Sequence, residues 1–151
     1  MKRSPLRKKS QSPVALCKDR IQAILRQIGI IRDGGCFMRK FRKFGGACGG
    51  YTKAGKLILQ WDHLNSRAHS VSYGDTRLGL CVCLRHHIYF KKQYPAQYEA
   101  CAREFIGVKN CILLDKVRAD TKAYRMDEYD WMNVEIALTQ ELEKSGAKRR
   151  T

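Results

Sequence analysis

The sequence predicts an α+β protein in which a small core of two strands and one helix lies between N- and C-terminal helices. Residues 13–28 and 128–144 carry apolar side chains at helical spacing. Between them, "KLILQWDH" and "LGLCVC" are short apolar runs, which are typical of strands. A chain of 151 residues has room for one domain with appended helices or tails.

The first helix is expected after a basic arm. Residues 1–12 are rich in Lys, Arg and Ser, a composition that favours disorder. Ser12 followed by Pro13 is a typical pair of N-cap and first-turn residues, so the helix should begin there. Gly29 is the expected end of the helix.

The chain changes character between residues 33 and 56, where paired glycines indicate loops and tight turns. Within this part, "CFMRKFRKF" interleaves Phe37, Phe41 and Phe44 with four cations. We expect these phenylalanines to face the core rather than to stack on bases. Strands should follow at about 56–62 and 78–83, and a helix at 84–92.

The C-terminal third is predicted to be helical. Pro95 should begin one helix and Gly107 should end it. The last helix, over 128–144, has its apolar residues on one face, and we expect this face to pack on the chain's own core. The expected organisation is a basic arm, an N-terminal helix, a core, a helical extension and a basic tail, at 1–12, 13–32, 33–106, 107–146 and 147–151.

The charge of the chain indicates a polyanionic partner. The formal net charge is +16, and residues 1–45 hold thirteen Lys and Arg against two Asp. Such a field attracts nucleic acid, whether DNA or RNA, although a solubilising tail is the alternative. No apolar run is long enough to span a membrane, and the N-terminus has no apolar signal segment. We therefore expect a cytoplasmic protein without a membrane partner, and the sequence leaves its oligomeric state open.

The cysteines indicate free thiols or metal ligands rather than disulfides, because the chain is expected in a reducing compartment and holds seven of them. Those within helical patterns are interpreted as small core residues: Cys17, Cys101 and Cys111. The others cluster along the chain with the histidines, all of which lie between positions 63 and 87.

Cys83 and His86 have a chelating spacing that suits tetrahedral zinc, since two residues separate them. Cys36 and Cys48 are the candidates for the second pair of ligands, and the glycines around Cys48 would let the backbone bend toward a metal. Cys81 is a rival of Cys83, because alternation along a strand puts both on one face. The alternative to zinc is a set of ordinary buried thiols.

Asp62 and His63 end the first predicted strand, and His87 lies on the predicted helix that follows the second strand. A carboxylate and an imidazole from separate elements can bind one divalent cation. His63 points to the other side of the strand end and could act as a base. A base that deprotonates water, together with a cation that neutralises charge on phosphate, provides what phosphodiester hydrolysis needs.

The motif "WDH" at 61–63, followed by "LCVCLRHHIYFK" at 80–91, resembles the HNH endonucleases of the ββα-metal fold in their zinc-containing form. The surrounding "DHLNSR" and "HHIYFKKQYPAQY" resemble small nucleases encoded by phages and prophages. The resemblance covers roughly residues 33–106. It implies a metal-dependent DNA endonuclease in a bacterial cytoplasm, whose products carry 5′-phosphate and 3′-hydroxyl ends.

The resemblance also implies a role for each site residue. Asp62 and His87 would bind the catalytic cation, Mg²⁺ or Mn²⁺, and His63 would be the general base. Structural Zn²⁺ would be held by Cys36, Cys48, Cys83 and His86. Basic side chains expected on the phosphates are Arg39, Lys40, Arg42, Lys43, Arg67 and Lys91. His69, in the same loop as Arg67, is expected to be a bystander.

The sequence departs from the family pattern in two places. Leu78 stands where the family usually has its middle Asn, a role that Asn65 or Asp75 could take over. Eleven residues separate Cys36 from Cys48, which is more than the usual two to four. The alternative function is therefore a non-catalytic, zinc-stabilised DNA-binding protein with a decayed nuclease site.

Overall fold

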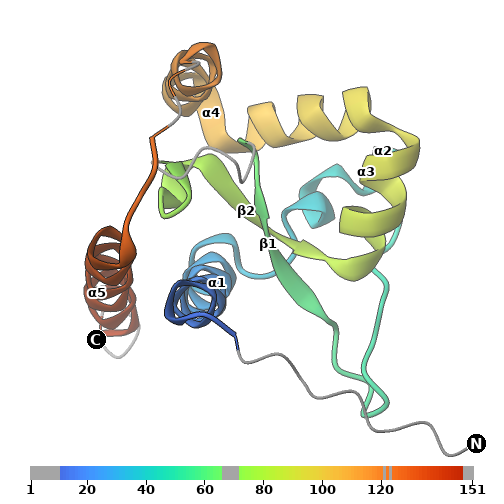
Figure 1. The fold of residues 1–151 in the computed structure, drawn as a ribbon. Helices are drawn as coiled ribbons and strands as arrows, with labels where there is room; N and C mark the ends of the chain where they lie inside the picture. The colour runs from blue at the N-terminus through green and yellow to red at the C-terminus, as the bar shows by residue number, and fades with distance from the viewer. Residues whose placement is uncertain (1–10, 66–71, 121, 123, 148–151) are drawn as a thin grey trace, which may run out of the picture.

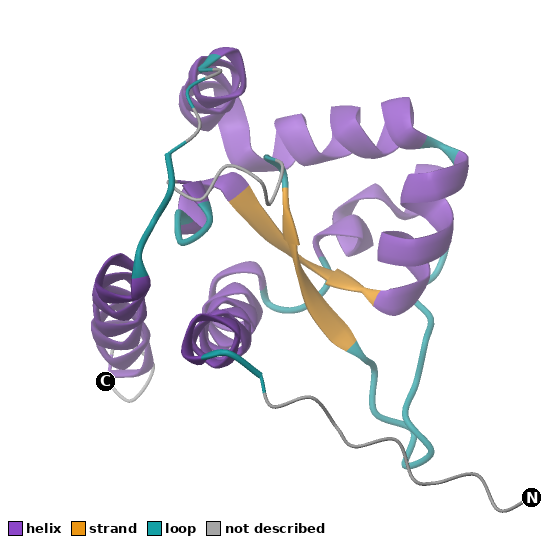
Figure 2. Cartoon of the chain, in the orientation of Figure 1, coloured by secondary structure: helices purple, strands orange, loops and turns teal. Residues whose placement is uncertain are grey.

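The structure, a computed structural model, describes residues 11–65, 72–120, 122 and 124–147. Within them an antiparallel pair of strands lies among helices, so the predicted α+β class is confirmed (Figures 1 and 2). Strand β1 (Leu59–His63) pairs with β2 (Gly79–Cys83), and Trp61 lies opposite Cys81. The strands cross the centre of the molecule, with helices on both sides.

The helical segments differ widely in length. In chain order they are α1 (Pro13–Asp33), η1 (Phe37–Phe41), α2 (Arg42–Gly45), η3 (Thr76–Leu78), η4 (Arg85–Phe90), α3 (Lys91–Gln93), α4 (Pro95–Ala119) and α5 (Glu128–Ala147). The helix expected at 84–92 is present as η4, which has π-type hydrogen bonding, followed directly by α3.

The first helix begins where the sequence predicts but ends later. Ser12 caps α1, because its Oγ accepts a hydrogen bond from the amide of Ala15. The expected end at Gly29 is wrong: α1 continues to Asp33 and is terminated by Gly34, which has φ 69°. Gly29 instead permits close packing, since a Cβ at this position would lie 2.9 Å from ring atoms of Trp61.

The first strand also begins later than expected, at Leu59 rather than near residue 56. Leu57 forms an isolated bridge with Tyr51 instead of pairing with β2. The amide of Ile58 donates to the carbonyl of Gly50 at 2.8 Å, which continues this separate hairpin. The apolar run "KLILQWDH" therefore takes part in two structures: its first residues pair with the segment around Tyr51, and its last residues pair with β2.

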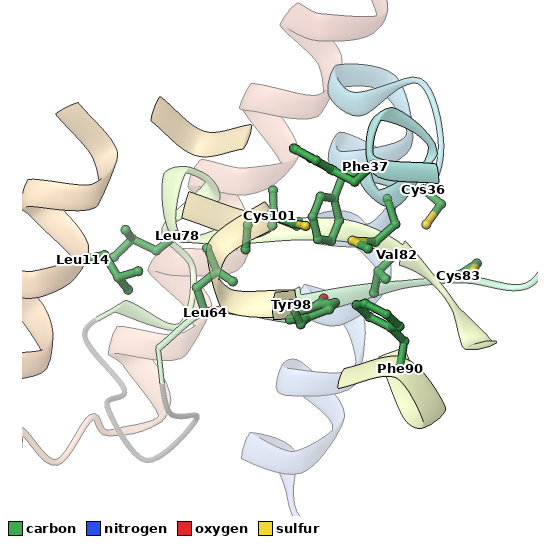
Figure 3. Packing of buried hydrophobic residues seen from close by; sticks show 14 residues of the cluster. Cys36, Phe37, Leu64, Leu78, Val82, Cys83, Phe90, Tyr98, Cys101 and Leu114 are labelled. Carbon is green, nitrogen blue, oxygen red and sulfur yellow. The ribbon is translucent and has the colours of Figure 1, made fainter. Parts of the chain in front are cut away.

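Two apolar clusters lie on either side of the strands. One joins the strands to η1 and α4, and Figure 3 shows it around Val82 of β2. Within it Phe37 packs edge-on against Tyr98, with 5.5 Å between ring centroids. The other cluster joins Trp61 to α1 and to Trp131 of α5, so α5 packs on the chain's own core as expected.

The prediction that all three phenylalanines of "CFMRKFRKF" face the core is correct for two of them. Phe37 and Phe41 are buried, whereas Phe44 is 71% exposed. In the single turn of α2, the inward position is taken by Gly45, which lies against Met38 and His86. The neighbouring Phe44 is consequently directed to the surface.

Gly107 interrupts α4 as predicted, with φ 79° and ψ 165°, but a helix resumes after it. Ion pairs tie the two halves of α4 together: Arg103 to Asp115 at 2.6 Å, and Arg118 to Glu99 at 2.7 Å. Among the described helices, none is both long and apolar enough to cross a membrane.

We expect Gly29→Val to lower the free energy of unfolding by about 2 kcal/mol, because the added side chain must displace the buried Trp61 ring. Urea unfolding followed by circular dichroism measures this change. Gly146→Val in α5 is the control, since a Cβ there has no neighbour within 4 Å among the described residues. Equal stability of the two variants would contradict the tight contact between α1 and β1.

Candidate functional site

The four predicted zinc ligands come together in the structure. The ligand atoms of Cys36, Cys48, Cys83 and His86 all lie within 4.8 Å of one another. They come from separate segments: the start of η1, the glycine-rich loop after α2, the end of β2 and η4. Three thiols and one imidazole are a typical donor set for structural zinc, so these residues fit that metal.

The ring of His86 is oriented by its second nitrogen. Nε2 lies 3.0 Å from the carbonyl oxygen of Gly45, which can only accept, so Nε2 carries the hydrogen. The lone pair of Nδ1 then faces the sulfur of Cys83 at 3.1 Å and that of Cys36 at 3.5 Å. A histidine that binds a metal usually donates its other ring hydrogen in this way, which fixes the direction of the ligand nitrogen.

Arg85 fastens the glycine-rich loop to the start of η4. Its side chain donates to the carbonyl oxygens of Gly45, at 3.1 Å, and Ala47. Its own amide donates to the carbonyl of Gly49 at 3.2 Å. Cys48 lies between these anchored residues, which explains how a ligand eleven residues after Cys36 reaches the cluster.

The thiols of the cluster are electrostatically coupled. A hydrogen bond from the Cys36 thiol lowers the pKa of Cys83 well below its usual value. The same contact raises the pKa of Cys36, and burial raises that of Cys48. A bound cation would stabilise the thiolate forms of these cysteines and release their protons.

Cys81, the rival ligand, lies outside this cluster. Its amide donates to Asp33 at 2.9 Å, and its Cβ would be 3.1 Å from a Cβ at Gly29, so it faces α1. Alternation would put Cys81 and Cys83 on one face, but β2 ends at Cys83 and turns into η4. This turn directs Cys83 toward the loop.

A second group of polar side chains surrounds Asp62, which is only 3% exposed. Lys91 Nζ lies 2.7 and 2.8 Å from its two carboxylate oxygens, and Tyr98 donates its hydroxyl at 2.7 Å. His87 Nε2 lies 3.2 Å from Oδ1. Burial raises the pKa of Asp62, but hydrogen bonds from His87, Lys91 and Tyr98 outweigh it and lower the pKa to about 2.

His87 is held with Nε2 toward Asp62. Its Nδ1 lies 2.6 Å from Oε1 of Gln60, an acceptor, so Nδ1 carries a hydrogen. The 3.2 Å contact with Asp62 is a hydrogen bond when Nε2 is protonated. When Nε2 is not protonated, its lone pair and the carboxylate form two ligands that could share a divalent cation.

His63 projects to the opposite side of β1 from Asp62, as predicted, and lies between α1 and the segment before η3. Its Nε2 is 3.0 Å from the carbonyl oxygen of Tyr73, and the two rings lie 4.6 Å apart. Its Nδ1 is 3.5 Å from the amide nitrogen of Gln22, which also donates to the Tyr73 hydroxyl at 2.8 Å.

A cleft of about 350 Å³ separates α1 from β1 and η4. Gln22 and Arg26 line it from α1, and Gln60 and His87 line it from the other side. Because Gln22 also contacts His63, the cleft adjoins the proposed base and one proposed cation ligand. Helix α1 therefore forms one wall of the candidate active site.

The predicted phosphate-binding residues have diverse positions. Arg39, Arg42 and Lys43 are exposed on η1 and α2, whereas Lys40 Nζ lies 4.6 Å from the centre of the Phe105 ring. Lys91 contacts Asp62. Arg67 and His69 lie outside the described residues.

Leu78, in the place of the family's Asn, is a buried core residue, and its carbonyl accepts a hydrogen bond from the amide of Leu64. Asn65 donates to Ser72 Oγ at 2.9 Å, which links the end of β1 to the segment before η3. Asp75 caps η3. The two expected substitutes are bonded to other side chains: Asn65 to Ser72, and Asp75 to Arg77.

Sequence reasoning missed Gln22, Gln60, Tyr73 and Tyr98, which position the two histidines and Asp62. In the sequence, Tyr98 occupies an apolar position of a predicted helix. Nothing in this pattern indicates that its hydroxyl is directed at a carboxylate. Gln60 carries the one available signal, because strand alternation puts it on the same side as Asp62.

Comparisons of the chain with protein-family models, with characterised proteins and with solved structures find no match.

We expect the purified chain to bind one equivalent of zinc and Cys48→Ser to reduce this stoichiometry, because a hydroxyl is a poor zinc ligand. Elemental analysis after gel filtration measures the metal content. Cys111→Ser is the matched control, since the Cys111 thiol donates a hydrogen bond to the carbonyl of Arg103 and lies outside the cluster. Removal of zinc by a chelator should also lower the melting temperature. Unchanged zinc content in Cys48→Ser would contradict the assignment.

Proposed function

We propose that the chain is a metal-dependent DNA endonuclease of the HNH type, with a zinc-stabilised ββα core formed by β1, β2 and η4. The observation that carries the proposal is the meeting of Asp62 and His87. These residues come from β1 and η4, and their polar atoms are 3.2 Å apart beside a cleft. The resemblance of the motifs adds to this, and with it the expectation of a phage or prophage protein in a bacterial cytoplasm.

Asp62 and His87 would hold Mg²⁺ or Mn²⁺, because hydrogen bonds orient both side chains before any cation binds. The cation would neutralise the charge that develops on the phosphate and on the departing oxygen. Carboxylate oxygens are preferred ligands of both ions, and a histidine nitrogen is compatible with Mn²⁺.

His63 would take the proton from the attacking water. The carbonyl of Tyr73 holds the hydrogen on Nε2, which leaves the lone pair of Nδ1 as the base. This backbone contact would orient the ring in place of the family's Asn. Gln22 lies within 3.5 Å of Nδ1 and would shape the approach of the water.

Lys91 would exchange partners during binding. In the structure its ammonium group donates hydrogen bonds to both oxygens of Asp62. It therefore occupies the place beside the carboxylate where a metal cation would bind. A divalent cation would displace it. The side chain is 38% exposed and could then contact a phosphate.

The second candidate function is a zinc-stabilised DNA-binding protein without catalysis. Two observations favour it: Leu78 replaces the family's Asn, and Lys91 already neutralises Asp62. The positive net charge serves either function, because phosphate contacts contribute affinity without sequence information.

We expect His63→Ala to reduce magnesium-dependent nicking of supercoiled plasmid by about a hundredfold or more, because the general base is lost. Zinc content and DNA binding should not change, which distinguishes loss of the base from loss of the fold. If the wild-type protein nicks no plasmid with Mg²⁺ or Mn²⁺ but still binds it, the non-catalytic function is correct.

We expect Lys91→Gln to bind Mn²⁺ about five- to tenfold more tightly than the wild type, because the competing ammonium group is removed. Electron paramagnetic resonance of free Mn²⁺, with zinc-loaded protein, measures this affinity. Lys92→Gln is the control, since it removes the same charge from the exposed neighbouring position. Equal affinities in the two variants would exclude competition between Lys91 and the cation.

A further inference from the structure

A groove of about 540 Å³ lies beside the zinc ligands, and none of the residues proposed for catalysis lines it. The residues that line it include Arg39 and Arg42, from η1 and α2, and Tyr51 and Leu57, from the hairpin before β1. Cys48 also lines it, so the loop that would bind zinc forms part of its surface.

The segment that builds this groove is strongly basic. From Gly34 to Trp61 the chain has six Lys and Arg residues and no Asp or Glu. All residues that line the groove fall within this segment, which has no carboxylate to neutralise the two guanidinium groups. The groove therefore suits an anionic ligand.

Tyr51 presents its ring at the surface from a well-anchored backbone. It is 58% exposed. A bridge with Leu57 and a hydrogen bond from the amide of Thr52 to the carbonyl of Lys56, at 2.8 Å, close the hairpin behind it. Because the hairpin sets the backbone of Tyr51, only the side-chain torsions have to be ordered when the ring stacks on a ligand.

We propose that this groove binds an unpaired nucleotide of a nucleic-acid strand. The Tyr51 ring stacks on the base, and Arg39 and Arg42 contact the flanking phosphates. Aromatic rings interleaved with cations are the usual means of holding single strands. A base within a duplex has both faces covered by its neighbours, so only an unpaired base offers a face to Tyr51.

The inference rests on the proposed function, because it takes DNA as the substrate. It adds which form of DNA the protein prefers. It predicts DNA with an unpaired segment, such as a single-stranded region or a branch, in preference to a continuous duplex. The groove would hold the unpaired strand while the cleft between α1 and β1 receives the bond to be cut.

The test is binding of a fluorescent oligothymidylate and of a duplex of equal length to the zinc-loaded full chain, without added magnesium. Tyr51→Ala should weaken oligothymidylate binding by about tenfold and duplex binding by less than about twofold, because one stacked base is lost. Tyr51→Trp should restore the affinity for the single strand. Arg39→Gln should weaken binding of both nucleic acids and lower the salt dependence.

Tyr129→Ala is the matched control, since Tyr129 is 71% exposed on α5, outside the groove. The inference is overturned if Tyr51→Ala binds the single strand as the wild type does, or weakens both nucleic acids equally. It stands if the selective loss is seen in a protein that never nicks plasmid, in which case only the nuclease proposal fails. If the protein nicks plasmid but Tyr51→Ala does not change binding of the single strand, the nuclease proposal stands and this inference fails.

Discussion

The turn from β2 into η4 is the constraint on which both candidate metal sites depend. Cys83 and His86, at this turn, face the sulfur cluster, and His87, one residue later, faces Asp62. Successive helical residues point in different directions, so one turn serves both sites. The contacts of Arg85 with the glycine-rich loop hold this turn in place. Zinc at the first site would therefore set the position of a ligand at the second.

Asp62 shows how the fold maintains a buried negative charge. Removing a carboxylate from water is costly unless other groups compensate for the lost hydration. Here Lys91, Tyr98 and His87 surround it, and they come from three different helical segments. An apolar residue would serve the packing of this position at lower cost. A carboxylate with this arrangement is better explained by a need for charge beside His87, which lines the cleft.

The sequence predicted the composition of the sites better than their supporting contacts. Cys83 and His86 have a spacing with chemical meaning, so the cluster could be anticipated from residue types. The hydroxyl of Tyr98 and the carbonyl of Tyr73 could not, because they reach the site through tertiary packing and belong to residue types that suit many positions. Gly29 was misread for a related reason. A glycine late in a helical pattern is usually a stop, and its close contact with Trp61 exists only in the folded chain.

The packing of α1 on α5 joins two segments that the ribosome synthesises at different times. Cys17 donates its thiol hydrogen to Glu135, 118 positions later, and Arg20 is paired with the same carboxylate. Until residues 128–147 emerge from the ribosome, the face of α1 that they cover has no partner. The support that α5 gives to α1 is thus added only after the residues that line the cleft have been synthesised. A nascent chain would therefore contain every residue of the two candidate metal sites before α1 is covered on this face.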